Sequence, residues 1–255
     1  MPMAQRHVKQ TKFTVKKHEN RRAKTPMSRN GTDRMIATIE KEVEYTRHMI
    51  GRDKLSPLVM DAMATVPREA FVPANLKSRA FDNGPLPIGH GQTISQPYIV
   101  ALMTDLLELR PEHTVLEVGT GSGYQSAILS QLCKTVYSME VIGELNHDAA
   151  EHLAQLGYDN VITCTGNGYE GWPEHAPYDG IIVTAAAPYI PEALIDQLRP
   201  GGRMVIPLGA PYSYQELALI NKDEQGNVEK RSVLGVAFVP LVNQQPGQGI
   251  QESNA

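Results

Sequence analysis

Residues 115–129 read VLEVGTGSGYQSAIL, and this stretch decides the fold class. Its first four residues form a short, mostly apolar run that is typical of a buried strand, and the residues after Gly123 follow a helical pattern. Glycines at 119, 121 and 123 remove Cβ atoms where backbone could approach a ligand. A strand, a glycine turn and a helix in this order predict the first crossover of a parallel α/β sheet, where ligands bind at the carboxyl ends of the strands.

The same alternation continues after that turn. Segments with strand character at 135–141, 161–166 and 178–186 alternate with helical patterns at 144–157 and 191–198, which implies right-handed crossovers and a mainly parallel sheet. Further strands follow up to residue 242, and the turn sequence DEQGN between the last two predicts an antiparallel hairpin. The expected fold is an α/β, Rossmann-like sheet, mainly parallel with antiparallel C-terminal strands.

The chain divides into four expected regions. Residues 1–31 form a basic leader that we expect to be disordered, and residues 243–255 form a tail with the same expectation. Residues 32–110 form a helical N-terminal subdomain, in which the Pro- and Gly-rich stretch 67–98 reads as an ordered loop without regular elements. Residues 111–242 form the ligand-binding α/β domain.

Charge is distributed unevenly between these regions. Residues 1–31 contain nine Lys and Arg against one Glu, whereas the rest contains 15 Lys and Arg against 27 Asp and Glu, for a net charge of −4. The leader is interpreted as a solvated extension, with contact to nucleic acid or another anionic surface as the alternative. The acidic body argues against nucleic acid as the main substrate.

Composition places the protein among ordinary globular chains, with 41% hydrophobic and 20% charged residues. The apolar runs fall short of the roughly 18–20 residues that span a bilayer, so no membrane segment is expected. Cys133 and Cys164 lie in apolar segments and are expected to be reduced thiols, consistent with the cytoplasm. Neither belongs to a metal-ligand pattern, so no metal site is expected.

The spacing of the glycines restricts the ligand. A dinucleotide fingerprint counted from Gly119 requires a third glycine where this chain has Tyr124, and counted from Gly121 it requires one where Ser126 stands. A phosphate-binding P-loop would need a Gly-Lys-Ser/Thr run, which the sequence lacks. The loop therefore predicts a ligand other than a dinucleotide or a nucleoside triphosphate.

Two further positions follow strand ends and suggest which ligand it is. Glu140 ends the next strand and could accept hydrogen bonds from both ribose hydroxyls of an adenosine. Asn167, in TGNGYEG after the third strand, could receive an adenine amino group, although Asn-Gly is also ordinary turn chemistry. Adenosine without phosphate points to S-adenosylmethionine, and Glu117 would then face its amino-acid end.

S-adenosylmethionine donates a methyl group, so the protein must also hold a group that accepts it. The stretch GHGQTISQPY, residues 89–98, contains the candidate residues for this acceptor site. Ser95 lacks a nucleophile elbow, and His90 lies between glycines, where a well-positioned base is not expected. Ser95 instead reads as the N-cap of a helix with Pro97 in its first turn, or as a hydroxyl that holds a carboxylate at the helix start. These two interpretations are compatible. A carboxylate acceptor is already ionised at pH 7 and needs no general base.

At this point the residues resemble a known family. The segments PLPIGHGQTISQPYIVALMTDLLEL and VLEVGTGSGYQSAIL, with VPREAFVP upstream and LIDQLRPGGRMVIPLG downstream, closely resemble the protein-L-isoaspartate (D-aspartate) O-methyltransferases over roughly 33–242. The resemblance implies methyl transfer to the free carboxyl of L-isoaspartyl or D-aspartyl residues in damaged proteins. Ser95 then matches the active-site serine. The implied cofactor positions are Thr93, Ile94, Ser95, Glu117, Gly119, Thr120, Gly121, Ser122, Gly123, Glu140, Val141, Asn167 and Gly168.

One departure bears on function: the family usually has Gly-Asp-Gly where this chain has Gly166-Asn167-Gly168. A neutral acceptor would bind the adenine amine more weakly than a carboxylate does. This substitution leaves open an alternative in which the chain is an S-adenosylmethionine-binding adaptor with weak turnover. The basic leader leaves open a second alternative, an RNA methyltransferase. The expected partners are isoaspartyl proteins and peptides, with no stable nucleic-acid partner and a monomer favoured over an oligomer.

Overall fold

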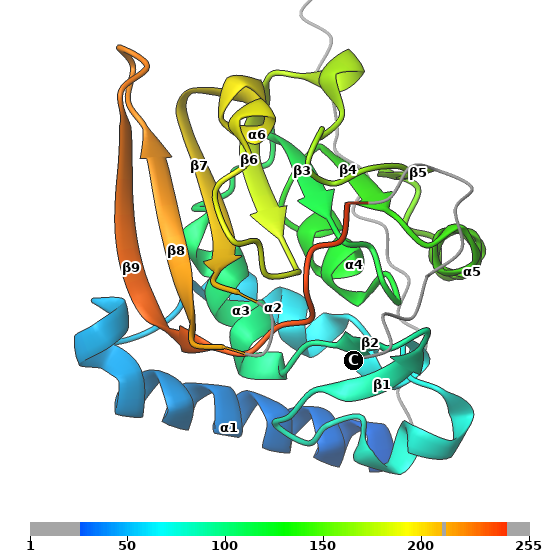
Figure 1. Cartoon of the computed structure of the whole chain (residues 1–255). Helices are drawn as coiled ribbons and strands as arrows, with labels where there is room; N and C mark the ends of the chain where they lie inside the picture. The colour runs from blue at the N-terminus through cyan, green and yellow to red at the C-terminus, as the bar shows by residue number, and fades with distance from the viewer. Residues whose placement is uncertain (1–25, 211–212, 244–255) are drawn as a thin grey trace, which may run out of the picture.

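The computed structural model describes residues 26–210 and 213–243, and its core is a seven-stranded sheet (Figure 1). The strand order is β5-β4-β3-β6-β7-β8-β9. β3 through β7 are parallel, whereas β8 and β9 are antiparallel additions at one edge. The expected sheet is confirmed, including the terminal hairpin. The strands are β3 Thr114–Val118, β4 Thr135–Glu140, β5 Val161–Thr165, β6 Tyr178–Val183, β7 Leu198–Leu208, β8 Gln215–Lys222 and β9 Val228–Val236.

Alternation along these strands builds two hydrophobic layers. Successive side chains of a strand point to opposite faces, so Ile182 lies on one face while Ile181 and Val183 lie on the other. The first face packs against α2 (Pro57–Thr65), α3 (Pro97–Leu106) and α4 (Tyr124–Ser130), and the second packs against α6 (Glu192–Gln197). α5 (Gly143–Leu156) lies beside β4 and β5. Both faces are therefore covered, as a parallel sheet requires.

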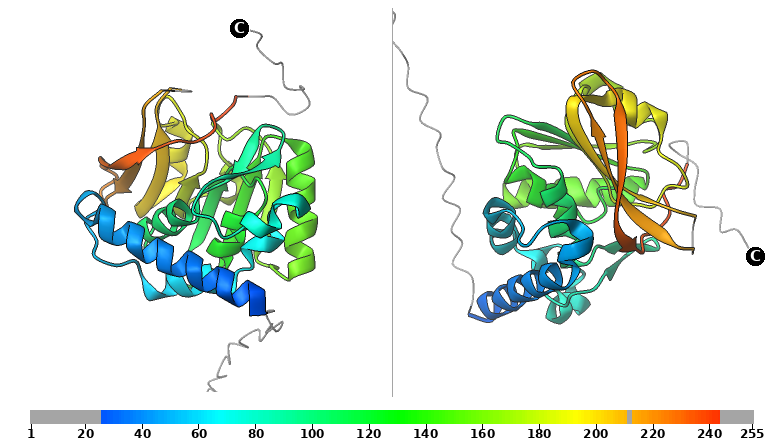
Figure 2. Two further views of the ribbon diagram at one scale, coloured as in Figure 1. Left: turned by 90° about the horizontal axis from the view of Figure 1, so that it is seen from below. Right: turned by 90° about the vertical axis from the view of Figure 1, so that its left-hand side faces the viewer.

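The first helix is longer than the sequence suggested. α1 spans Pro26–Ile50 and lies along the outside of the molecule, where it contacts α2, α3 and β9 (Figures 1 and 2). The leader boundary expected at residue 31 therefore falls inside a helix. Gly31 and Thr32 are already buried against the rest of the protein. The expectations for residues 1–25 and 244–255 lie outside the described residues.

The stretch 67–98 contains regular structure that the sequence did not predict. Two short 3₁₀ helices, Arg68–Ala70 and Ala74–Arg79, precede a hairpin of β1 (Leu86–Gly89) and β2 (Gln92–Ile94). Its two turn residues, His90 and Gly91, have φ values of 51° and 69°. Two positive φ values are typical of the type I′ turn that joins tight hairpins, so the expectation of an irregular loop was wrong here.

After β9 the chain crosses the carboxyl ends of the parallel strands, and we call residues 237–243 the C-terminal strap (Figure 1). Ala186, which follows β6, donates to the carbonyl of Val239 at 2.8 Å and accepts from the amide of Leu241 at 2.7 Å. These bonds hold the strap over the edge of the sheet where ligands bind. None of the helices in the described part of the chain combines the length and apolar character needed to cross a bilayer.

Candidate active site

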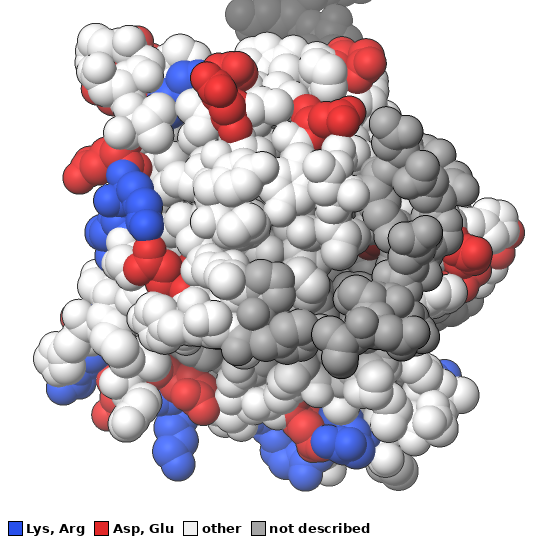
Figure 3. All heavy atoms as spheres, in the orientation of Figure 1, with Lys and Arg blue, Asp and Glu red and all other residues white. Residues whose placement is uncertain are grey.

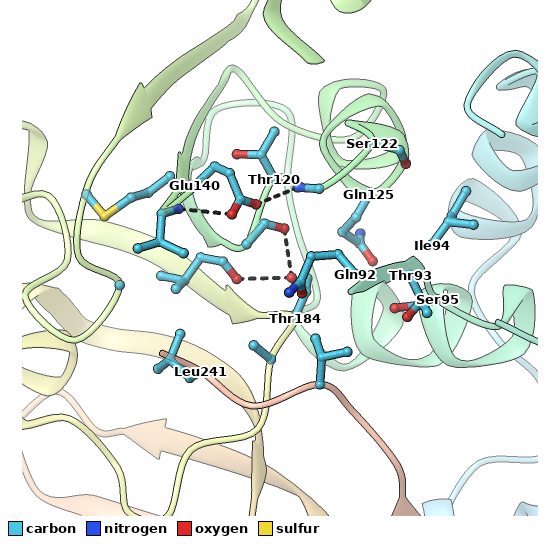
Figure 4. A pocket seen from close by; sticks show the side chains of 18 of the residues that line it. Gln92, Thr93, Ile94, Ser95, Thr120, Ser122, Gln125, Glu140, Thr184 and Leu241 are labelled. Atoms are coloured by element: carbon cyan, nitrogen blue, oxygen red, sulfur yellow. Dashed lines mark hydrogen bonds between the residues drawn. The ribbon is translucent and has the colours of Figure 1, made fainter. Parts of the chain in front are cut away.

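A cavity lies at the carboxyl ends of the parallel strands, as the glycine turn predicted. This glycine-loop cavity encloses about 790 Å³ open to solvent and is bounded by the loop after β3, the end of β4, strand β2 and the strap (Figure 4). Of the expected cofactor positions, those that line it are Thr93, Ile94, Ser95, Gly119, Thr120, Gly121, Ser122, Glu140, Val141 and Gly168.

Gly119 is the tightest point of the loop. Its φ of 100° is rare for residues with a side chain, and a Cβ there would collide with the hydroxyl of Thr184. That hydroxyl donates to the Gly119 carbonyl at 2.7 Å, while the Gly119 amide donates to Met139 at 2.7 Å. Gly123 behaves differently: it precedes α4 with a φ of 83° and does not line the cavity. The loop is therefore fixed at its first glycine by two neighbouring strands.

Glu140 lies at the end of β4 with its carboxylate against the loop (Figure 4). One oxygen accepts from the Gly121 amide at 2.8 Å, and the other accepts from the amides of Val141 and Ile142 at 3.0 and 3.1 Å. A carboxylate has about four acceptor positions and these amides occupy three, so one position remains for a hydroxyl group from the cavity side. Glu140 is the single charged residue that lines the cavity in the described chain.

Glu117 does not face the cavity as expected. Its side chain is 0% exposed, and one carboxylate oxygen accepts from the hydroxyls of Ser126 and Ser138, the latter at 2.6 Å. Burial raises the pKa of Glu117 to about 8, the two hydroxyl bonds lower it, and the charge of Glu140 raises it further. Glu117 and Ser138 are direct neighbours in the β3–β4 ladder, so their side chains share the face that α4 covers.

Asn167 also departs from its expected direction. Its amide nitrogen donates to Glu170 at 2.9 Å and to Asn243 of the strap at 3.0 Å, and its oxygen accepts from the Tyr169 amide at 3.1 Å. The side chain therefore ties the β5 loop to the strap and does not line the cavity. The backbone of Gly168 forms the cavity wall at this point instead.

Ser95 is not the helix cap that the sequence suggested. The N-cap of α3 is Gln96, no side chain caps the helix, and Pro97 occupies its first turn as expected. Ser95 instead lines both the glycine-loop cavity and a second, adjoining cavity of about 1020 Å³ open to solvent. The adjoining cavity lies between the start of α3, the end of β9 and the strap. His90 is exposed in the hairpin turn and lines neither cavity.

The two cavities share a wall. Four residues line both of them: Thr93, Ser95, Thr184 and Val239. Among the described residues, the lining of the adjoining cavity carries no charged side chain, and neither cavity is lined by Lys or Arg. Such a site can hold two ligands side by side, but it lacks the cations that bind phosphate groups.

Sequence reasoning missed Thr184 and the strap. Thr184 directly follows β6, so the strand-end argument applied to Glu140 could also have found it. The strap contributes Val239, Pro240, Leu241 and Val242 to the glycine-loop cavity. It reaches the cavity through contacts more than 50 residues apart in the chain, for which the sequence offers no local signal.

Known proteins resemble this chain in sequence over most of its length. A family model described as protein-L-isoaspartate(D-aspartate) O-methyltransferase matches residues 44–246. "Protein-L-isoaspartate O-methyltransferase 2" of Syntrophobacter fumaroxidans is 59% identical over 208 residues, covering 82% of this chain and 84% of that protein. The protein of the same name from Polaromonas sp. is 56% identical over 210 residues, covering 82% of this chain and all of that one.

Solved structures agree with the sequence relatives. One protein-L-isoaspartate O-methyltransferase superposes with a TM-score of 0.71 and 28% identity, over 82% of this chain and 65% of that one. A Plasmodium falciparum protein, titled a putative protein-L-isoaspartate O-methyltransferase in complex with S-adenosyl-L-homocysteine, superposes with a TM-score of 0.66 and 25% identity, over 81% and 98%. The chain therefore belongs to the protein-L-isoaspartate(D-aspartate) O-methyltransferase family.

Proposed function

We propose that this chain transfers a methyl group from S-adenosylmethionine to the free carboxyl of L-isoaspartyl and D-aspartyl residues in damaged proteins. The observation that carries the proposal is that Thr93, Ser95, Thr184 and Val239 line both cavities, so that the two cavities adjoin. Methyl transfer requires a donor and an acceptor held in contact and in line, and two ligands in adjoining cavities can meet that requirement where the cavities join.

The glycine-loop cavity fits the methyl donor. Glu140 offers its remaining acceptor position to a ribose hydroxyl, and the loop backbone around Gly119 and Gly121 leaves room for the amino-acid part. The cavity has no Lys or Arg in the described chain, which suits a ligand without phosphate. We propose that Glu117, Gly123 and Asn167 do not contact the donor and instead hold the surrounding strands, loop and strap in place. When bound, S-adenosylmethionine supplies an electrophilic methyl group and leaves as S-adenosylhomocysteine.

The adjoining cavity fits the acceptor. Its wall toward the donor carries the hydroxyls of Thr93 and Ser95, which can donate to a carboxylate oxygen. The remaining lining is mostly apolar, including Ile99, Val236 and Phe238, so a bound carboxylate loses much of its water. Desolvation makes the carboxylate more reactive toward the methyl group, and no proton has to be removed. This agrees with the absence of His90 from the lining.

The partners follow from the same cavities. We propose that isoaspartyl proteins and peptides are the substrates and that the chain acts as a monomer, since one chain supplies all the walls described. The free thiols of Cys133 and Cys164 support a cytoplasmic location. The RNA methyltransferase alternative is not favoured, because the described residues that line the two cavities include no cation for phosphate. On the face shown in Figure 3, the blue side chains lie at the margins.

A pair of peptides that differ only in Asp or isoAsp at one position tests the function. We expect base-labile methyl esters on the isoAsp peptide and none on the Asp peptide. Binding of S-adenosylmethionine by calorimetry, without methyl esters on either peptide, would instead support the adaptor alternative. Methyl groups on tRNA and none on the isoAsp peptide would support the RNA methyltransferase.

Ser95→Ala is expected to lower kcat on the isoAsp peptide by about 10- to 100-fold, the value of one hydrogen bond to a charged group. Its Tm should change little, because the Ser95 side chain caps no helix. The control is Ser56→Ala, which removes a serine at the start of α2 that also makes no cap bond and lines neither cavity. Equal kcat values for the two variants would remove Ser95 from the mechanism.

A further inference from the structure

Arg68 is a fully buried cation directly behind the wall that the two cavities share. Its side chain is 0% exposed and comes from the short 3₁₀ helix Arg68–Ala70. Nε donates to the carbonyl of Ala80 at 2.8 Å, and Nη2 donates to the carbonyl of Ser95 at 2.8 Å. The guanidinium carbon lies 4.8 Å from the centre of the Tyr124 ring, and Tyr124 lines the glycine-loop cavity. Arg68 thus joins the acceptor side of the site to the donor side.

A guanidinium in this place is costly for stability. Transferring a cation from water to a protein interior costs several kcal/mol unless it is well paired. Burial lowers the pKa of Arg68, and the Tyr124 ring and hydroxyl raise it, but arginine still carries its charge at neutral pH. Its partners are two neutral carbonyls and an aromatic ring, and the described residues form no ion pair with it. An apolar side chain would fill the same volume at lower cost.

The charge has a use if the acceptor is an anion. Neither cavity is lined by a cation in the described chain, so a carboxylate beside Ser95 meets only neutral donors there. Arg68 fixes the orientation of the Ser95–Gln96 peptide through its carbonyl. Because this peptide is trans, its N–H points away from Arg68, and the cation strengthens the peptide dipole in that direction. Ser95 and Gln96 both line the adjoining cavity.

We propose that Arg68 is a positioning residue for the acceptor carboxylate, which acts through the Ser95–Gln96 peptide and supplies the positive charge that the cavity lining lacks. This inference rests on the function proposed above. It predicts that Arg68 governs how strongly the site prefers a carboxylate over a neutral amide of the same shape. A residue needed only for packing would leave that preference unchanged.

Two variants separate the charge from the hydrogen bonds. Arg68→Lys keeps the positive charge but loses the planar fork that donates to both carbonyls, whereas Arg68→Gln can donate to a carbonyl and carries no charge. For each we would measure kcat, the KM of an isoaspartyl peptide, and the inhibition constant of the matching isoasparaginyl peptide. Calorimetry with S-adenosylmethionine and Tm report whether the variants are folded.

In Arg68→Gln we expect the preference for carboxylate over amide to fall at least about tenfold, while the Kd for S-adenosylmethionine stays within about threefold. In Arg68→Lys the preference should stay within about threefold of the original protein, and kcat should fall about tenfold because the Ser95 peptide is less firmly held.

An unchanged preference in Arg68→Gln would overturn the proposal, and so would an unchanged kcat in Arg68→Lys. If Arg68→Gln does not fold, the kcat of Arg68→Lys alone decides whether the proposal holds. Failure of the proposed function is recognised separately, because the original protein would then not methylate the isoaspartyl peptide at all.

Discussion

Gly119→Ala is expected to lower the affinity for S-adenosylmethionine by at least about 100-fold, close to the loss of about 3 kcal/mol of binding free energy. The new Cβ would occupy the place of the Thr184 hydroxyl, which donates to the carbonyls of Val118 and Gly119 at 3.1 and 2.7 Å. The φ of 100° adds strain of about 1–3 kcal/mol for a residue with a side chain. To relieve the collision and the backbone strain, either the glycine loop must move into the cavity or Thr184 must move away from it, and both movements change the ligand site. Isothermal titration calorimetry measures the affinity directly.

The control for backbone strain is Gly226→Ala. Gly226 has a φ of 85° in the turn between β8 and β9, and a Cβ there would meet no atom within 4 Å. Both variants should lose similar stability from the backbone, but only Gly119→Ala should lose the ligand. If the two variants bind S-adenosylmethionine equally well, the collision with Thr184 does not shape the site.

The sheet could be predicted from the sequence because its signals are local. The strands β3, β4 and β6 are short apolar runs, each followed by a turn and a helix, and the structure confirms this pattern. β5 is followed only by the short 3₁₀ helix Pro173–His175, and β7 by the antiparallel strand β8. The hairpin of β1 and β2 escaped prediction because its strands are four and three residues long. Its turn, His90-Gly91, lacks the Asn-Gly or Asp-Gly pair that marks most type I′ turns.

Within the site, position along the chain was easier to predict than side-chain direction. Glu140 and Glu117 both lie near strand ends, but only Glu140 lines the cavity. Glu140 is the last residue of β4, where the chain turns along the cavity, whereas Glu117 lies one residue inside β3 and points to the face under α4. Asn167 was misjudged for a different reason, since its partner Asn243 lies 76 residues away in the strap.

Glu117→Gln is expected to remove a strong pH dependence of stability. The pKa of Glu117 is about 8 in the folded chain against 4.5 as its ordinary value, so the folded chain binds this proton more tightly. The contribution of Glu117 is therefore fully present below about pH 4.5 and is lost as the pH rises toward 8. Since each pKa unit corresponds to about 1.4 kcal/mol, the loss amounts to up to about 5 kcal/mol. The glutamine cannot ionise, and its carbonyl can still accept from the hydroxyls of Ser126 and Ser138.

Urea unfolding of both proteins without ligand between pH 5 and pH 9 measures this difference. The two free energies of unfolding should be similar near pH 5, and the variant should become progressively more stable than the original protein toward pH 8.5. Glu216→Gln is the matched control, because hydrogen bonds from Lys230 and Ser232 lower the pKa of this partly exposed carboxyl. Its contribution to stability depends on pH in the opposite direction, because it is lost as the pH falls through the lowered pKa. Parallel curves for Glu117→Gln and the original protein would mean that Glu117 is ionised inside the fold and that an unseen cation compensates its charge.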